Sequence, residues 1–192
     1  MKHLFTTTAF ALLISASVFI RPAMSAPLLV AQTLTLVDCD GTKVTFSEAD
    51  LRLMDQVKEE QCIWVGQSSG YIGIFDCSGV PLSEILKLVN STVNARDFIR
   101  ENTYVIFRGT DDYQVIASWT ELMGSADGLR AMIMLDKDGQ PLSDEEGKFR
   151  VLFPADKYVG RSVKCLDTIE IHRAEGFKDF PKDKTPAEPE KQ

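Results

Sequence analysis

Short runs in which apolar and polar residues alternate recur along most of the chain, and such alternation predicts half-buried β-strands. Gly, Asp and Ser separate many of these runs, and Asp40-Gly41 predicts a tight hairpin. Two further turns are expected at 109–112 and 136–140. The expected strands and short apolar segments are 33–37, 43–46, 57–65, 71–75, 104–107, 114–118, 131–135, 149–153 and 168–172.

Three stretches have the features of short helices instead. Ser47 can cap a helix over 48–54, whose first turn carries acidic residues, and 119–123 fits one helical turn. The clearest helical spacing of apolar residues is that of 81–89, with Leu82, Ile85, Leu86 and Val89. Because strands and long helices do not alternate regularly, a doubly wound parallel sheet is not expected. The predicted fold class is α+β, a mixed β-sheet core with short helices.

Both ends of the chain differ from its middle. Residues 9–20 form an uncharged apolar run, and Ala23-Met24-Ser25 follows it with small residues at the cleavage positions of a signal peptide. The run is shorter than the roughly 20 residues that span a bilayer, although an uncleaved anchor is the alternative. We therefore predict a signal peptide over 1–25, one domain over 26–175 and a periplasmic or secreted protein. Residues 176–192 are expected to form a disordered tail, since hydrophobic residues give way to Pro, Lys, Asp and Glu.

Composition narrows the class of function. The 192 residues are 44% hydrophobic and 26% charged, which is typical of one globular domain. The formal net charge of −7 disfavours binding to nucleic acid, whose phosphates an acidic protein repels. A zinc site with several histidines is excluded, because the chain has only His3 and His172.

Four cysteines, Cys39, Cys62, Cys77 and Cys165, would meet an oxidising compartment after export. They contain no CxxC pair, and four cysteines allow three complete sets of disulfides among which the residues themselves do not choose. One thiolate could instead stay free as a nucleophile or metal ligand. A nucleophile–histidine pair would have to use His172, which lies in an expected strand and is better explained as structural.

Three blocks of residues give a more specific indication. The first runs from Cys62-Ile63-Trp64 through Tyr71-Ile72-Gly73 to Ser78-Gly79-Val80-Pro81-Leu82, and the second is Gly109-Thr110-Asp111-Asp112-Tyr113. The third comprises Asp138-Gly139-Gln140-Pro141-Leu142, Gly147-Lys148-Phe149-Arg150, Phe153-Pro154 and Gly160-Arg161-Ser162-Val163-Lys164. In this order the blocks resemble the molybdopterin-binding domain of the sulfite oxidase family, over about residues 33–172.

The resemblance implies an α+β fold that holds a molybdenum–molybdopterin cofactor in a cleft. It places Cys62 at the position of the catalytic thiolate that ligates the metal, and a soft thiolate suits a metal already held by dithiolene sulfur. It places Arg150, Arg161 and Lys164 around the cofactor phosphate or an anionic substrate. The alternatives are a structural half-cystine at position 62 and three solvated surface cations.

The sequence also departs from the family pattern. Ile63-Trp64-Val65-Gly66 replaces an Arg-rich segment, and Phe177 and Phe180 stand near the place of an active-site tyrosine. Asp111 and Tyr113 match a turn that usually reads Asp-Gly-Tyr, so Asp112 would be strained at positive φ, and we expect this turn to be structural. Cys77 and Cys165 occupy positions where the family commonly has tryptophan, which suggests a disulfide between them.

Two functions are therefore compatible with the sequence. The first is an exported molybdenum-cofactor oxidoreductase that transfers an oxygen atom in a two-electron reaction on a small-molecule substrate. The second is a cofactor-free ligand-binding or sensory module that reuses the fold. In either case the expected partner is a redox or signalling protein in the periplasm or at the membrane.

Overall fold

The computed structural model describes residues 30–90 and 102–175. The predicted signal peptide (1–25) and the predicted disordered tail (176–192) therefore lie outside the described residues, as do residues 26–29 and 91–101 of the predicted domain. No helix in the two described ranges is long and apolar enough to cross a membrane.

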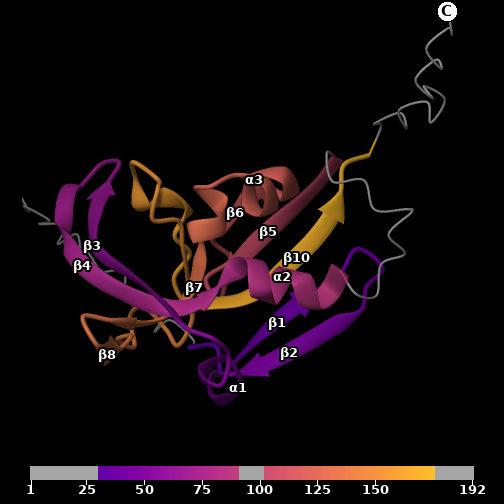
Figure 1. Ribbon diagram of the computed structural model, residues 1–192, viewed down its shortest axis with the longest axis horizontal. Coiled ribbons are helices and arrows are strands. Elements are labelled where there is room, and N and C mark those ends of the chain that lie inside the picture. Colours follow the sequence, from indigo (N-terminus) through magenta and orange to yellow (C-terminus); the bar gives the residue numbers. More distant parts are fainter. Residues whose placement is uncertain (1–29, 91–101, 176–192) are drawn as a thin grey trace, which may run out of the picture.

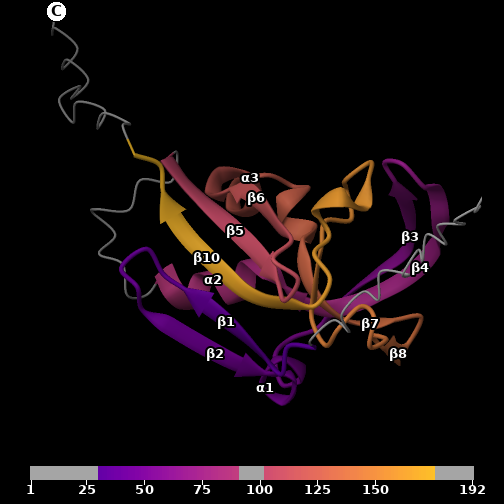
Figure 2. The same cartoon turned by 180° about the vertical axis from the view of Figure 1, so that it is seen from behind.

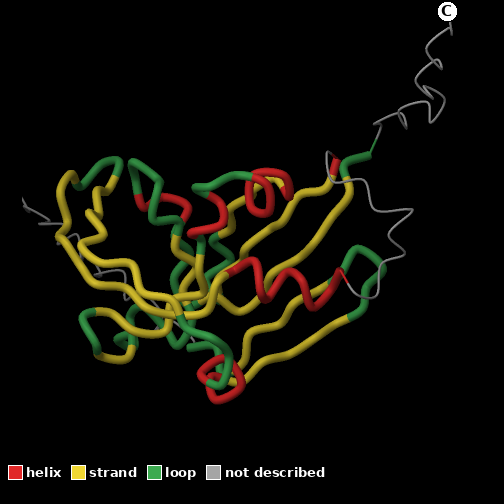
Figure 3. The backbone as a smooth tube through the Cα atoms, in the orientation of Figure 1, coloured by secondary structure: helices red, strands yellow, loops and turns green. Residues whose placement is uncertain are grey.

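Strands make up most of the fold, as Figure 3 shows, and they form two sheets. The first sheet has the order β2-β1-β10-β5-β6, in which β1 and β10 are parallel and the other neighbours are antiparallel. The second has the order β3-β4-β7-β8, with β9 paired to β7. The first sheet comprises β1 (Thr33–Val37), β2 (Lys43–Ser47), β5 (Thr103–Gly109), β6 (Gln114–Ser118) and β10 (Leu166–Arg173). The second comprises β3 (Val57–Gly66), β4 (Gly70–Pro81), β7 (Met132–Lys137), β8 (Gln140–Pro141) and β9 (Arg150–Leu152).

Three short α-helices and two 3₁₀ turns complete the described fold. Ser47 caps α1 as expected, because its hydroxyl accepts from the backbone N–H of Asp50 while the Asp50 carboxylate accepts from Ser47 N–H. The apolar side of α2 packs into the core with Leu82, Ile85 and Leu86, which are almost completely buried. The helices are α1 (Glu48–Arg52), α2 (Leu82–Asn90) and α3 (Trp119–Gly124), and the 3₁₀ turns are η2 (Gly128–Arg130) and η3 (Val159–Arg161). The α+β fold class is confirmed.

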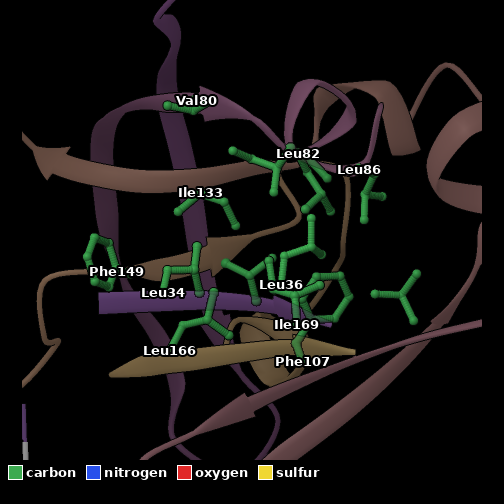
Figure 4. Close-up of a cluster of buried hydrophobic side chains, with 14 of the residues drawn as sticks. Leu34, Leu36, Val80, Leu82, Leu86, Phe107, Ile133, Phe149, Leu166 and Ile169 are labelled. Carbon is green, nitrogen blue, oxygen red and sulfur yellow. The ribbon is translucent and has the colours of Figure 1, made fainter. Parts of the chain in front are cut away.

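One main core joins the two sheets and the helices (Figure 4). Leu34 and Leu36 come from the first sheet, Val80 and Ile133 come from the second, and Leu86 comes from α2. A second, smaller core lies against the β3–β4 hairpin and contains two cysteines, a tryptophan and two methionines. In Figures 1 and 2 this hairpin extends away from β1, β2 and β10, toward one end of the molecule. The separate small core therefore belongs to that end.

The path of β4 differs from the expectation. The sequence predicted a short apolar segment that ends at Phe75, and Asp76, Ser78 and Gly79, which follow it, have low β-propensity. The strand instead continues to Pro81, because its second half pairs with β3 on one side and β7 on the other. Pairing on both sides outweighs local preference here. Gly79 lies opposite Met134 of β7, and a Cβ atom built on Gly79 would be 2.0 Å from the carbonyl oxygen of Ile133.

The turn between β5 and β6 contains the strain that the sequence indicated. Asp112 has φ of +63°, a left-handed conformation that glycine adopts more easily than aspartate. We expect Asp112→Gly to stabilise the protein by roughly 0.5 kcal/mol in urea denaturation, since the relief of strain exceeds the entropy that glycine adds to the unfolded chain. The matched control is Asp144→Gly at an exposed turn without positive φ, which should destabilise. Equal effects of the two changes would contradict this account.

Candidate functional site

A cavity of about 450 Å³ lies between the β3–β4 hairpin, β7, β9 and the turn that contains η3. Its size is within the range of small-molecule sites, about 300 to 1,000 Å³. The lining combines aromatic side chains with three basic and three acidic residues. The residues used below are Trp64, Phe75, Asp111, Tyr113, Lys137, Ser143, Glu145, Glu146, Arg150, Ser162 and Lys164.

Aromatic rings from the hairpin form one wall. The ring centroids of Trp64 and Phe75 are 4.8 Å apart, with an interplanar angle of 59°. The Arg150 guanidinium lies 4.1 Å from the Trp64 ring centroid, and Lys137 Nζ lies 5.1 Å from that of Phe75. Such cation–π contacts fix the cations over the rings. Trp64 is buried, yet its Nε1 has no hydrogen-bond partner among the described residues. A buried N–H without a partner is costly, so a ligand that brings an acceptor would gain from it.

A buried ion-pair network lies beside this wall. Glu146 accepts from Arg150 Nη1 at 2.9 Å and from Lys137 Nζ at 2.6 Å, and Arg150 Nε donates to the Ser162 hydroxyl at 2.7 Å. Arg150 and Glu146 are only 3% and 5% exposed. Burial acts to raise the pKa of Glu146, but the bond and charge of Lys137 and the charge of Arg150 outweigh it, so this pKa is lowered. The carboxylate is therefore ionised at neutral pH.

Within this network, two of the three cations of the cavity, Lys137 and Arg150, form ion pairs with Glu146. Arg150 donates through Nε to Ser162 and through Nη1 to Glu146, so Nη2 is the group that could donate to a ligand. Lys164 is exposed at the cavity and makes no ion pair within the described part of the chain, so it is the cation available to an anionic group. The cavity can hold a flat, polar ligand that carries at least one acceptor and one negative group.

Of the three cations predicted for one cleft, the structure brings two together. Arg150 and Lys164 both line the cavity. Arg161 instead lines a smaller hollow, where it forms ion pairs with Asp156 at 2.6 Å and Glu121 at 2.7 Å and lies over the Phe153 ring. The bond to Asp156 raises the pKa of Arg161, and burial acts in the opposite direction. Arg161 thus ties η3 to α3 in this structure.

Cys62 does not line the same cavity as Arg150 and Lys164. Its side chain is buried in the small core, and its Sγ donates to the Glu59 carbonyl at 3.7 Å. The residue borders a different hollow of about 300 Å³. Burial is the main cause that raises the pKa of the Cys62 thiol, whereas a metal-ligating thiol must lose its proton. The catalytic and metal-ligand role of Cys62 stays a prediction.

The suggested disulfide between Cys77 and Cys165 is not present, since all four cysteines are free thiols. The two residues have different surroundings. Cys77 is in the small core with Cys62, whereas Cys165 has φ of +45° and packs against Gly147, where an added Cβ would be 2.6 Å from its Cα. Matching positions in a family pattern did not determine which thiols are neighbours.

Several residues that line the cavity were not predicted from the sequence, or were expected to have another role. Glu146 follows another acidic residue in a turn, a pattern that by itself indicates solvated charge, and Asp111 and Tyr113 were expected to be structural, yet all three line the cavity. Trp64 could have been found, because it is two residues after Cys62 in a strand and so shares its face. No local signal identifies Lys137, which lies at the end of β7 and reaches Glu146 in the turn before β9.

The chemistry of the lining fits the organic part of a pterin cofactor better than it fits the metal. The aromatic wall suits a flat heterocycle, the unpaired Trp64 Nε1 suits a ring acceptor, and Lys164 suits a phosphate. No cysteine is among the residues that line the cavity. No cluster of three or more His, Cys, Asp and Glu residues in the described ranges could bind a metal ion by itself.

Comparison with known proteins agrees with the fold described above. Residues 30–180 match the family described as "Oxidoreductase molybdopterin binding domain". No curated protein matches the chain. The fold is similar to that in the crystal structure of the sulfane dehydrogenase SoxCD from Paracoccus pantotrophus, with a TM-score of 0.58 and 17% sequence identity. The match covers 77% of this chain and 40% of the SoxCD chain, so it establishes the fold only. The family match covers most of the sequence and confirms the resemblance to the sulfite oxidase family: the chain belongs to the oxidoreductase molybdopterin-binding domain family, whose cofactor is molybdenum–molybdopterin.

Proposed function

We propose that this protein is an exported molybdenum-cofactor oxidoreductase that binds the pterin in the Trp64–Arg150 cavity. The reaction proposed for it is a two-electron oxygen-atom transfer on a small-molecule substrate. The observation that carries the proposal is a 450 Å³ cavity with an aromatic wall, a buried guanidinium and an unpaired indole N–H, in a chain whose family binds this cofactor. A periplasmic or membrane-bound redox partner would exchange the electrons.

The residues of the chain would divide the work of binding. Trp64 and Phe75 would contact the flat ring, Arg150 Nη2 and the Trp64 N–H would donate to its acceptors, and Lys164 would pair with the phosphate. The Glu146 ion pairs keep Arg150 in place against Trp64 without ligand. The bound cofactor would supply the redox chemistry.

The test is the cofactor content of the full-length protein, exported from a host that makes molybdopterin. We expect near-stoichiometric pterin, and roughly tenfold or greater loss of it in Trp64→Ala, because the change removes a stacking surface and the unpaired donor. The readouts are pterin fluorescence after oxidation and molybdenum by elemental analysis. The matched control is Ile63→Ala, next in sequence and 61% exposed, which should retain the pterin.

The role of Cys62 is tested in the same preparations. Cys62→Ser should keep the pterin and lose the molybdenum if the thiolate is the metal ligand. Unchanged molybdenum in Cys62→Ser would remove Cys62 from the metal site. A wild-type protein without pterin and without molybdenum, from a host that loads another member of the family, would refute the proposed function.

One observation favours a second function, a cofactor-free ligand-binding or sensory module. The three acidic and three basic residues of the cavity balance, and the nearest candidate metal ligand faces a different hollow. A cavity of this kind accepts a neutral or zwitterionic molecule without a metal. The second function predicts a folded, metal-free protein whose melting temperature rises with such a ligand in the wild type and does not rise in Trp64→Ala.

A further inference from the structure

The first half of β4 has an edge that no strand of the described ranges covers. Over residues 70–79, β4 pairs with β3 on one side, whereas β7 pairs with its other side only over residues 77–81. The contact on that side ends at Asp76, whose backbone carbonyl accepts the Asp138 N–H at 2.7 Å. Figures 1 and 2 both show this half of β4 on the outer side of the hairpin. Residues 70–75, the outer β4 edge, therefore point backbone groups away from β3 toward no described strand.

Exposed apolar side chains gather on one face of this edge. Ile74 lies opposite Ile63 of β3, and Tyr71 lies opposite the residue two positions further along β3. Such neighbours share a face, so the three side chains lie together, turned away from the small core that contains Cys62 and Trp64. Tyr71 is 67% exposed, Ile63 61% and Ile74 53%. Single exposed apolar residues are common on protein surfaces, but a contiguous group of them marks an interaction surface.

The outer β4 edge also lacks the residues that usually protect a strand edge. Native edges carry charged side chains or proline, which oppose pairing with another chain. Of the other edge strands, β2 begins with Lys43 and β8 ends with Pro141. Residues 61–75 contain no charged side chain and no proline, and they are the longest uncharged run in the described ranges. The one irregularity is at Ile72, where the pairing with β3 shifts by a residue. An edge of this kind is expected to be covered when the protein is assembled.

The charge of the chain indicates which partner fits this edge. The formal net charge is −7, so two copies repel each other wherever their carboxylates meet. At the outer β4 edge two copies can approach without opposing charges, whereas a charged partner would find no opposite charge to pair with. The edge also fits itself, because a two-fold axis makes two identical strands run antiparallel and form a ladder.

We propose that a second copy of this chain covers the outer β4 edge, with residues 70–75 of the two copies paired antiparallel across a two-fold axis. The pairing joins two two-stranded ribbons into a four-stranded sheet, which is more stable than either ribbon alone. It thereby stabilises the hairpin that supplies Trp64 and Phe75 to the cavity. Six paired residues per copy are far fewer than the roughly 20 to 30 per side of a standard interface, so the dimer is weak and reversible.

The experiment follows the full-length protein from micromolar to near-millimolar concentration. Sedimentation velocity should show a reversible rise from the mass of one chain to that of two. Hydrogen exchange measured by mass spectrometry should slow over residues 70–75 as the concentration rises, and should not change over β6. The dimer does not rest on the proposed function, because neither measurement needs a cofactor, whereas the proposed function is tested by pterin and molybdenum content.

Three results would overturn the proposal. The first is the mass of a single chain at every concentration. The second is a dimer whose slowed exchange lies in β6 or elsewhere and not in residues 70–75. The third is slow exchange over residues 70–75 in a protein with the mass of a single chain, which would show that another segment of the same chain covers the edge.

Variants test the edge directly. Ile74→Lys should raise the dissociation constant of the dimer tenfold or more, because it places a cation of each copy near the two-fold axis, and Ile74→Val should keep the dimer. The matched control is Ile116→Lys, at a 57% exposed isoleucine of the edge strand β6, which should dimerise like the wild type. Undiminished dimer in Ile74→Lys, or an equal loss in Ile116→Lys, would contradict the proposed interface. The exchange pattern of the wild type locates the interface even where a variant fails to fold.

Discussion

Glu146→Gln is expected to destabilise the protein by about 3 kcal/mol, because it removes the negative charge that pairs with the buried Arg150 guanidinium. The amide keeps the size of the side chain and one acceptor, which places the loss near the lower end of the range for breaking a buried pair. Arg150 would remain charged over Trp64, at 3% exposure. Urea denaturation measures the change in the free energy of unfolding.

The neighbouring carboxylate provides the control for this change. Glu145 is exposed, and Glu145→Gln should alter the free energy of unfolding by no more than about 0.5 kcal/mol. A loss of the same size in both variants would show that net charge, rather than the buried pair, determines the result.

The stability difference also has a defined dependence on pH. Burial acts against the ionised form of Glu146, but Lys137 and Arg150 prevail and hold its pKa below the ordinary 4.5. A pKa that is lower in the folded state contributes stability above the unfolded pKa, and this contribution is lost as pH falls through the folded pKa. The difference in the free energy of unfolding between the wild type and Glu146→Gln should therefore be largest near neutral pH and should decrease below roughly pH 4.

Gly79→Ala is expected to destabilise the protein by about 3 kcal/mol, near the upper end of the usual cost of overpacking. The added Cβ would be 2.0 Å from the Ile133 carbonyl oxygen and 2.8 Å from Met134 Cα. Both are backbone atoms of β7, so relief requires β4 and β7 to separate. Thermal and urea unfolding measure the loss.

Gly160→Ala is the matched control for this substitution. Gly160 has no atom within 4 Å of a built Cβ and no positive φ, so the change should be close to neutral. If Gly79→Ala were as mild as Gly160→Ala, the close approach of β4 and β7 would be wrong. The comparison thus tests the pairing of β4 with β7.

The sequence determined the local parts of this structure. Apolar and alternating runs located the strands of both sheets except β8 and the second half of β4. Asp40-Gly41 located a hairpin turn at which Gly41 has φ of +86°, and the spacing from Leu82 to Val89 located α2. It also indicated the strain at Asp112 and the correct family. These features depend on residues within a few positions of each other, or on blocks in a fixed order, so the sequence is enough to predict them.

The tertiary structure decided which distant residues meet. Parallel pairing joins β1 to β10 from opposite ends of the domain, and the second half of β4 is a strand because β3 and β7 pair with it on its two sides. The same packing puts Arg150 on Trp64 but Arg161 on Phe153, and Cys77 beside Cys62 rather than Cys165. Local sequence fixes the direction in which a side chain leaves its strand, whereas burial and pairing over long separations fix its partner. These contacts between distant residues therefore determine which side chains line the cavity.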